Sequence, residues 1–130
     1  MTPRFPFFPD IELTFPILLQ FSIINLLNNA LKFTPARGSI TLDYTVDKEK
    51  QCILFSVTDT GTGIPEDKQE LVFQRFEKLN EFVQGTGLGL AICKLTIQYM
   101  GGDIWIDKNY KNGARFVFSH PIKKRESEEK

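Results

Sequence analysis

The chain has 130 residues, 42% of them apolar, which is enough to bury the core of one domain but not of two. Its 16 basic and 16 acidic residues cancel, and this excludes the basic field that holds a nucleic-acid backbone. The longest apolar stretch, Ile17 to Leu31, contains a glutamine, a serine and three asparagines and is too polar to span a membrane. We therefore expect a soluble domain that contacts neither nucleic acid nor membrane.

The first half of the chain predicts a lead-in, a helix and a hairpin. Residues 1–16 mix prolines with phenylalanines, which predicts an irregular segment. From Ile17 to Thr34 apolar residues recur at helical spacing, and Pro35 ends the pattern. The alternation in Ser39 to Val46 and the run from Cys52 to Asp59 predict two strands, which we expect to pair.

The second half predicts two helices and another hairpin. Pro65 with two following acidic residues predicts the start of a helix that runs to about Phe76, followed by a loop from Glu77 to Thr86. A further helix is predicted from Leu88 to Met100, ended by two glycines. The residues expected on its apolar face are Leu88, Ala91, Ile92, Leu95 and Tyr99.

The chain is predicted to close as strands Asp103 to Asp107 and Ala114 to His120 around an Asn112-Gly113 turn. Residues 123–130 are almost all charged and predict a solvated tail. The predicted domain therefore occupies residues 17–122. Its two cysteines, Cys52 and Cys93, lack metal-ligand spacing and are expected to be buried, reduced thiols, which favours the cytoplasm.

A polar stripe crosses the first predicted helix. Asn25, Asn29 and Lys32 stand at i, i+4 and i+7 and so share one helix face. Because buried amides and ammonium groups need partners, three aligned ones indicate a polar ligand or a metal on that side. An exposed helix face is the alternative.

A second cluster, Asp59 to Pro65, lies where a strand ends and a helix is predicted to begin. Asp59 shares a strand face with Val57 and Phe55, so its carboxylate points to the apolar side and needs a donor. Gly61 and Gly63 allow a ligand to lie close against the main chain. An ordinary Asx-type turn is the alternative.

A third cluster, Gly85 to Leu90, leads from the predicted loop into a helix. Its glycines expose N–H groups next to the positive end of a helix, an arrangement that suits phosphates. It neither follows a strand, as in a Rossmann fold, nor ends in the Gly-Lys-Ser/Thr of a P-loop. Both common nucleotide folds are therefore disfavoured.

Taken in order, four segments resemble the N, G1, F and G2 boxes of the ATP-binding domain of sensor histidine kinases, within the family that includes gyrase, MutL and heat-shock chaperone ATPases. They are Asn25 to Thr34, Asp59 to Pro65, Phe73 to Phe76, and Gly85 to Leu90. The resemblance covers about Leu18 to Pro121. It implies an α/β (α+β) fold, a two-layer sandwich of the Bergerat type with helices on one face of a mixed sheet.

The resemblance also implies ATP and Mg²⁺ as ligands. It makes Asn29 the side-chain ligand of the Mg²⁺ that bridges the phosphates, and Lys32 a phosphate contact. Phe33 would pack on the adenine ring and Asp59 would accept a hydrogen bond from the adenine amino group. Gly61 and Gly63 would admit the nucleotide.

The remaining implied roles fall between the F and G2 boxes. Phe73 and Phe76 would anchor a lid, with two core aromatics as the alternative. Lys78, or Arg75 in its place, would bring a cation to the γ-phosphate. The residues expected to wrap the phosphates with backbone N–H groups are Gly85, Thr86, Gly87, Leu88 and Gly89.

The chain differs in two features from the ATP-hydrolysing members of the family that it resembles. Those relatives carry a glutamate base one turn before the Mg²⁺ asparagine, where this chain has Asn25, so hydrolysis is expected to be poor. The only histidine, His120, ends a strand and is expected to be structural or exposed, so the phosphoryl acceptor is absent.

We therefore expect the catalytic domain of a two-component sensor histidine kinase. It would pass the γ-phosphoryl group to a histidine on a separate dimerisation domain of the parent kinase, and reach a response regulator only indirectly. The isolated domain is expected to be a cytoplasmic monomer, whether or not the parent protein is membrane-anchored. The alternatives are a serine kinase that acts on an anti-sigma partner and a noncatalytic module that senses nucleotides or binds a partner.

Overall fold

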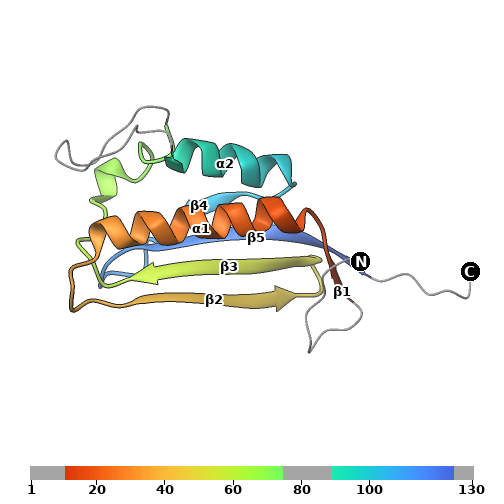
Figure 1. Ribbon diagram of the computed structural model, residues 1–130, viewed down its shortest axis with the longest axis horizontal. Coiled ribbons are helices and arrows are strands. Elements are labelled where there is room, and N and C mark those ends of the chain that lie inside the picture. The colour runs from red at the N-terminus through yellow and green to blue at the C-terminus, as the bar shows by residue number, and fades with distance from the viewer. Residues whose placement is uncertain (1–10, 75–88, 125–130) are drawn as a thin grey trace, which may run out of the picture.

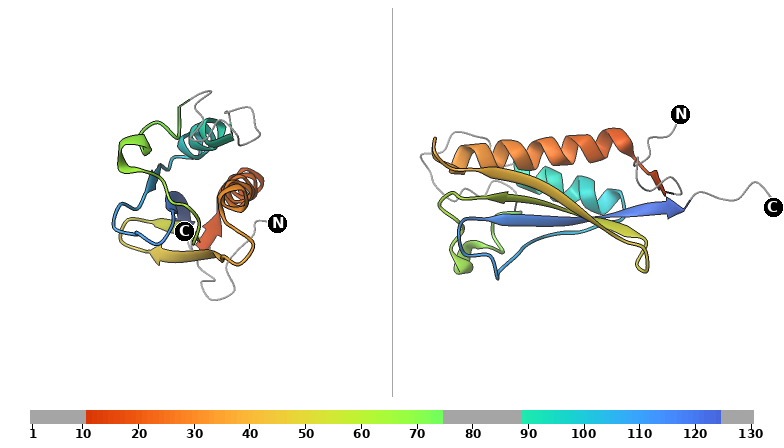
Figure 2. Two further views of the ribbon diagram at one scale, coloured as in Figure 1. Left: turned by 90° about the vertical axis from the view of Figure 1, so that its left-hand side faces the viewer. Right: turned by 90° about the horizontal axis from the view of Figure 1, so that it is seen from below.

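The computed structural model describes residues 11–74 and 89–124 of the chain. Two helices, α1 and α2, lie side by side over one face of a β-sheet (Figure 1). A view along the helices shows the same two layers, with the core between the sheet and the helix pair (Figure 2). This arrangement confirms the predicted two-layer α/β sandwich.

The elements agree with most of the predicted ones. In chain order they are β1 (Ile11–Leu13), α1 (Pro16–Phe33), β2 (Ile40–Asp47), β3 (Cys52–Asp59), the 3-10 turn η1 (Glu66–Lys68), α2 (Gly89–Tyr99), β4 (Ile104–Ile106) and β5 (Arg115–Lys124). Helix α1 begins at Pro16, whose fixed backbone angle suits a first helical turn. It ends before Pro35, which disfavours helical geometry in the residue that precedes it.

The sheet is antiparallel at every pairing in the described part of the chain. Its order is β1-β5-β3-β2, and β4 also pairs with β5. Both predicted hairpins, β2 with β3 and β4 with β5, are confirmed. The expectation of a mixed sheet is wrong, because β5 returns between β1 and β3 and runs opposite to both. This path brings the start of β5 beside the end of β3.

The core forms where one face of β3 and β5 meets the two helices. Phe55 and Phe118, neighbours across these strands, stack with their ring centroids 5.1 Å apart. The buried hydrophobic residues of the cluster are Leu19, Leu26, Ala30, Ile53, Phe55, Val57, Val72, Cys93, Ile97, Met100, Ile104, Ala114, Phe116 and Phe118. Each large side chain among them contributes roughly 1.5 to 3 kcal/mol of burial.

The helix predicted from Pro65 to Phe76 does not form within the described residues. A 3-10 turn covers Glu66–Lys68, and the following main-chain hydrogen bonds up to Gln74 also join residues three apart. Val72 belongs to the buried core and Phe73 packs against it, so these turns still hold the segment against the core.

Helix α2 buries a different face from the predicted one. Ala91 is buried as expected, but Ile92, Leu95 and Tyr99 are 43%, 66% and 73% exposed. The helix is apolar on more than one side, so its periodicity fits two orientations. The structure buries the side that carries Cys93, whose small thiol contacts the carbonyl oxygen of Ser22 in α1 at 3.7 Å.

Three smaller predictions also need correction or limits. Residues 11–13, expected to be irregular, form β1, because they pair with the end of β5. Strand β5 runs to Lys124, beyond the predicted end of that strand at His120. Both cysteines are free, but only Cys93 is buried and Cys52 is half-buried. The predicted loop from Glu77 to Thr86 and most of the charged tail lie outside the described residues.

No helix among residues 11–74 and 89–124 combines the length and the hydropathy that crossing a bilayer requires.

Candidate nucleotide-binding site

The polar stripe of α1 lines a hollow at the C-terminal half of the helix. Asn25 and Asn29 are half-buried there and Lys32 is exposed. The hollow measures about 400 Å³ and is lined by Asn25, Asn28, Asn29, Leu31, Lys32, Gly89 and Leu90. The stripe therefore faces a concave surface beside the start of α2, which is compatible with the predicted ligand site.

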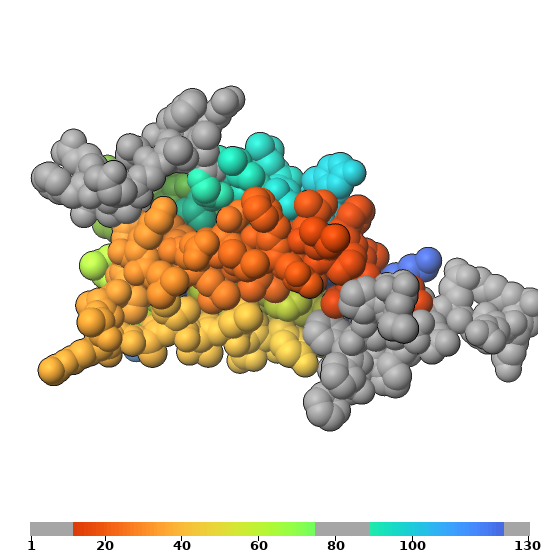
Figure 3. Space-filling model, viewed as in Figure 1, coloured from red at the N-terminus to blue at the C-terminus, as the bar shows by residue number. Residues whose placement is uncertain are grey.

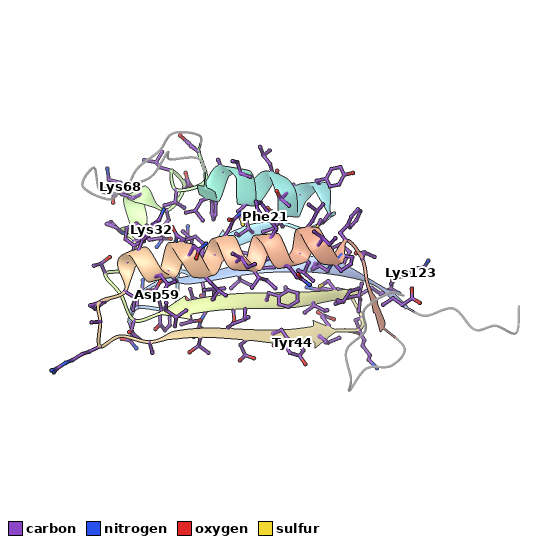
Figure 4. The ribbon with its side chains drawn as sticks, in the orientation of Figure 1. Phe21, Lys32, Tyr44, Asp59, Lys68 and Lys123 are labelled. Atoms are coloured by element: carbon purple, nitrogen blue, oxygen red, sulfur yellow. The ribbon has the colours of Figure 1, made fainter. Side chains whose placement is uncertain are left out.

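Helix α1 is open to solvent on the face that Figure 3 displays, with α2 on one side of it and β2 on the other. Lys32 and Asp59 lie toward the same end of the molecule, where α1 and β3 both end (Figure 4). The first two sequence clusters are thus brought together by the fold.

Asp59 is buried at the end of β3, with 2% of its surface exposed. Its Oδ1 atom accepts hydrogen bonds from the main-chain N–H groups of Gly61, at 2.9 Å, and Ala114, at 3.1 Å. The bond from Gly61 is the Asx-type turn that the sequence left as an alternative, and it uses only Oδ1. The Oδ2 atom has no partner among the described residues. Oδ2 is not among the fully buried atoms that lack a partner, so it reaches open space, where a carboxylate oxygen is suited to accept a donor from a ligand.

The two glycines after Asp59 are required by close main-chain contacts. A Cβ atom at Gly61 would lie 2.1 Å from the carbonyl oxygen of Phe33, the last residue of α1. Gly63 has a positive φ of 73°, and its Cβ would meet the carbonyl oxygen of Gly113 at 3.1 Å. The segment is therefore held between the end of α1 and the turn before β5. This packing gives Gly61 a structural role beside the predicted one of admitting a nucleotide.

Phe73 is anchored to the core. Its ring meets Phe116 of β5 edge to face, with centroids 5.9 Å apart, and the Lys94 ammonium lies 5.4 Å from its centroid. Both predicted roles of Phe73, lid anchor and core aromatic, are compatible with this contact. Gly89 begins α2, and a Cβ atom there would meet nothing within 4 Å. The candidates that lie outside the described residues are Arg75, Phe76, Lys78, Gly85, Thr86, Gly87 and Leu88.

Sequence reasoning did not identify the residues that hold Asp59 in place. Ala114 donates to its carboxylate, and the Tyr110 hydroxyl donates to its main-chain carbonyl oxygen at 3.0 Å. These partners stand 55 and 51 positions away along the chain. Only the pairing of β3 with β5 brings them together, and no local pattern in the sequence encodes it. Tyr110 and Ala114 also line a second hollow of about 250 Å³ beside residues 62–66.

His120 is fully buried near the other end of the sheet and so has a structural role, as expected. Its Nε2 atom lies 2.8 Å from the carbonyl oxygen of Thr14, and Nδ1 has no partner among the described residues. Burial lowers the pKa of His120 below 6.5, an effect that the hydrogen bond to Thr14 opposes. Burial also raises the pKa of the Cys93 thiol to about 12, so this thiol stays protonated.

The family model described as "Histidine kinase-, DNA gyrase B-, and HSP90-like ATPase" matches residues 15–124. The chain belongs to this family. The match includes both described clusters, the asparagine stripe of α1 and the segment after Asp59. It confirms the resemblance inferred from the N, G1, F and G2 boxes.

Curated relatives within the ATPase family are sensor kinases. The adaptive-response sensory kinase SasA of Synechocystis is 43% identical over 107 residues, which cover 81% of this chain and 28% of that protein. The sensor histidine kinase WalK of Bacillus subtilis is 38% identical over 109 residues, which cover 81% of this chain and 18% of that protein. This chain is therefore homologous to a part of those kinases and spans less than a third of their length.

Solved structures agree with the family assignment. The nucleotide-free catalytic domain of the histidine kinase ThkA superposes with a TM-score of 0.72 at 34% identity, over 85% of this chain and 70% of that one. Full-length ShkA in complex with AMPPNP superposes with a TM-score of 0.70 at 33% identity, over 85% of this chain and 22% of that one. The chain has the fold of a histidine kinase ATP-binding domain.

Proposed function

We propose that this domain binds Mg-ATP and, as part of a sensor histidine kinase, donates the γ-phosphoryl group to a histidine on a separate dimerisation domain. The observation that carries the proposal is the free Oδ2 of the buried Asp59, at the same end of the fold as the stripe of Asn25, Asn29 and Lys32. The Asp59 carboxylate suits the amino group of a purine base, and the stripe on α1 suits phosphates.

Asp59 would read the base. Its Oδ1 is already occupied by two main-chain N–H groups, so Oδ2 is the atom that would accept the 6-amino group of adenine. A carboxylate acceptor discriminates against a base that offers a carbonyl oxygen at the same place, because two acceptors repel. Phe33 and Gly63 would contribute to the surrounding surface.

The stripe on α1 would hold the triphosphate. Lys32 carries a positive charge at the edge of the hollow, and Asn29 offers an amide oxygen of the kind that Mg²⁺ accepts. Magnesium is usually held by few protein side chains together with phosphate oxygens, and a single asparagine fits that pattern. When bound, the ion would neutralise phosphate charge. Gly89 lines the same hollow, and we include Lys78 and residues 85–88 in the phosphate site by resemblance to the family alone.

Asn25 lines the hollow one turn before Asn29, and its amide cannot take a proton from water near neutral pH. The domain would therefore hydrolyse ATP slowly, and the γ-phosphoryl group would remain available for transfer to an imidazole. His120 cannot be the acceptor in the folded chain, because its ring is 0% exposed. Transfer would thus need a second, histidine-bearing domain and would use positioning and charge neutralisation.

The sensor-kinase relatives favour this function over the serine-kinase and noncatalytic alternatives. We propose residues 17–122 as the unit that carries the whole nucleotide site, and the cytoplasm, where ATP is supplied, as its location. A response regulator would receive the phosphoryl group only from the dimerisation domain.

Calorimetry tests the binding step. ATP and ADP should release or absorb heat on binding in the presence of Mg²⁺, and EDTA should weaken the binding of ATP. A chain that is folded by circular dichroism yet gives no heat with any adenine nucleotide would contradict the proposal.

A further inference from the structure

The main chain of Asp59 is held as firmly as its side chain. Its N–H group donates to the carbonyl oxygen of Ala114 at 2.8 Å. Its own carbonyl oxygen accepts a hydrogen bond from the Tyr110 hydroxyl at 3.0 Å. The N, O and Oδ1 atoms of Asp59 are therefore all fixed by the segment between β4 and β5 or by Gly61. Only Oδ2 remains for a ligand.

Tyr110 is itself held in place from the sheet. The guanidinium carbon of Arg115 lies 4.4 Å from the centroid of the Tyr110 ring, a cation–π arrangement. Arg115 also donates from Nε to the Thr58 hydroxyl at 3.0 Å and pairs through Nη1 with Asp107 at 3.3 Å. Thr58 directly precedes Asp59 in β3. The Tyr110 ring is thus held by Arg115, whose side chain is hydrogen-bonded to β3, the strand that ends in Asp59.

We propose that Tyr110 is a positioning residue for base recognition: its hydroxyl fixes the main chain of Asp59 and so aims Oδ2 at the amino group of the purine. This inference rests on the proposed function. Hydrogen bonds weaken steeply when donor, hydrogen and acceptor leave alignment. A rotation of the Asp59 main chain would misalign Oδ2 even while Oδ1 keeps its two N–H donors.

The hydroxyl group can be tested apart from the ring. Tyr110→Phe keeps the ring on Arg115 and removes only the donor to the Asp59 carbonyl oxygen. Tyr99→Phe is the matched control, because Tyr99 lies on α2, is 73% exposed and has no hydroxyl hydrogen bond with a described residue. Arg115→Lys is a second variant, which keeps the positive charge but removes both the flat group from the Tyr110 ring and the Nε donor to Thr58.

The readout is the affinity for Mg-ATP and for purine riboside triphosphate, which lacks only the 6-amino group. Tyr110→Phe should weaken ATP about three- to tenfold, the range expected for one hydrogen bond, and leave purine riboside triphosphate unchanged. Arg115→Lys should weaken ATP selectively in the same direction, and Tyr99→Phe should bind both ligands like the original chain. A structural role alone would weaken both ligands equally.

The outcomes separate the two proposals. If the original chain binds ATP and both Tyr110→Phe and Arg115→Lys bind it equally well, Tyr110 has no positioning role and the proposed function stands. An equal loss for the two triphosphates in folded variants also overturns the inference. If the original chain binds neither triphosphate, the proposed function fails and the inference fails with it. Should Tyr110→Phe not fold, Arg115→Lys decides alone.

Discussion

Two hydrogen bonds join Asp59, the last residue of β3, to Ala114, which directly precedes β5. The Asp59 N–H group donates to the carbonyl oxygen of Ala114 at 2.8 Å, and the Ala114 N–H group donates to Asp59 Oδ1 at 3.1 Å. Because the second bond uses the side chain, the sheet itself orients the carboxylate. A slip in the register of β3 against β5 would therefore also displace the group that we expect to read adenine.

Asp59→Asn should weaken ATP while it barely changes the binding of inorganic tripolyphosphate with Mg²⁺. An amide keeps one acceptor for the two N–H groups but presents its NH₂ where the adenine donor must bind. Losing a charge-assisted hydrogen bond costs about 1.5 to 3 kcal/mol, which corresponds to roughly ten- to a hundredfold in affinity. Calorimetry with the two ligands measures it.

The matched control for Asp59→Asn is Asp43→Asn, because Asp43 is exposed in β2 on the opposite face of the sheet. It should bind both ligands like the original chain. Equal weakening of ATP and tripolyphosphate by Asp59→Asn would remove Asp59 from base recognition.

Gly61→Ala should destabilise the fold, whereas Gly89→Ala should not. At Gly61 a Cβ atom would lie 2.1 Å from the Phe33 carbonyl oxygen. Relief of this contact requires a shift of main-chain atoms, which costs free energy. At Gly89 it would meet nothing within 4 Å. Overpacking of this kind costs about 1 to 3 kcal/mol, and alanine in a helix is favoured over glycine by up to about 1 kcal/mol. Urea unfolding of both variants checks the pair, and equal stability would be inconsistent with the contact.

His120 should make the fold less stable in mild acid. Its folded pKa lies below the ordinary 6.5, so the unfolded chain binds the proton more tightly. The stabilising contribution is fully present above pH 6.5 and is lost as the pH falls through 6.5 toward the lowered folded value. The slope can reach about 1.4 kcal/mol per pH unit for one proton.

Urea unfolding at about pH 7.5 and about pH 5.5 measures the effect of His120, since histidine is the side chain that ordinarily titrates in this interval. His120 is the only histidine of the chain, so His120→Gln should flatten the profile. An unchanged slope in that variant would assign the pH dependence to other groups.

The sequence predicted the fold where its signals are local. Pro35 marks the end of α1, and alternation with turn residues marks both hairpins. It failed where burial depends on a partner: α2 is apolar on several sides and only packing against α1 selects the face with Cys93. The prediction after Pro65 was also wrong, because Pro65 and the two acidic residues that follow it begin a 3-10 turn and not a longer helix.

The residues of the candidate site could likewise be predicted only where the signal in the sequence is local. Asn25, Asn29 and Lys32 could be grouped from spacing within one helix, and the hollow they line agrees with that grouping. Asp59 could be singled out because a carboxylate on an apolar strand face needs a donor. Its donors Ala114 and Tyr110 could not, because they come from the segment between β4 and β5, more than 50 residues away along the chain.

Asn25→Glu should raise ATP hydrolysis by the isolated domain. A carboxylate one turn before Asn29 could act as a general base for water, and such bases contribute about 10² to 10⁴ in rate. Nucleotide affinity should change little, although a negative charge near the phosphates offsets part of the gain. Phosphate release, compared between the original chain, Asn25→Glu and Asn25→Gln, measures the effect. Faster hydrolysis in Asn25→Gln than in Asn25→Glu would contradict a base at this position.

Phosphotransfer to histidine is the central claim, and one measurement tests it most directly. The chain is incubated with Mg²⁺, ATP labelled at the γ-phosphate and a supplied histidine-bearing dimerisation domain of a sensor histidine kinase, with an equivalent domain whose histidine is replaced as control. We predict a label on the intact dimerisation domain that is lost in acid and survives alkali, with ATP hydrolysis by the chain alone close to background. Labelling that survives acid, or steady hydrolysis at the rate of a dedicated ATPase with no transfer to histidine, would contradict the account.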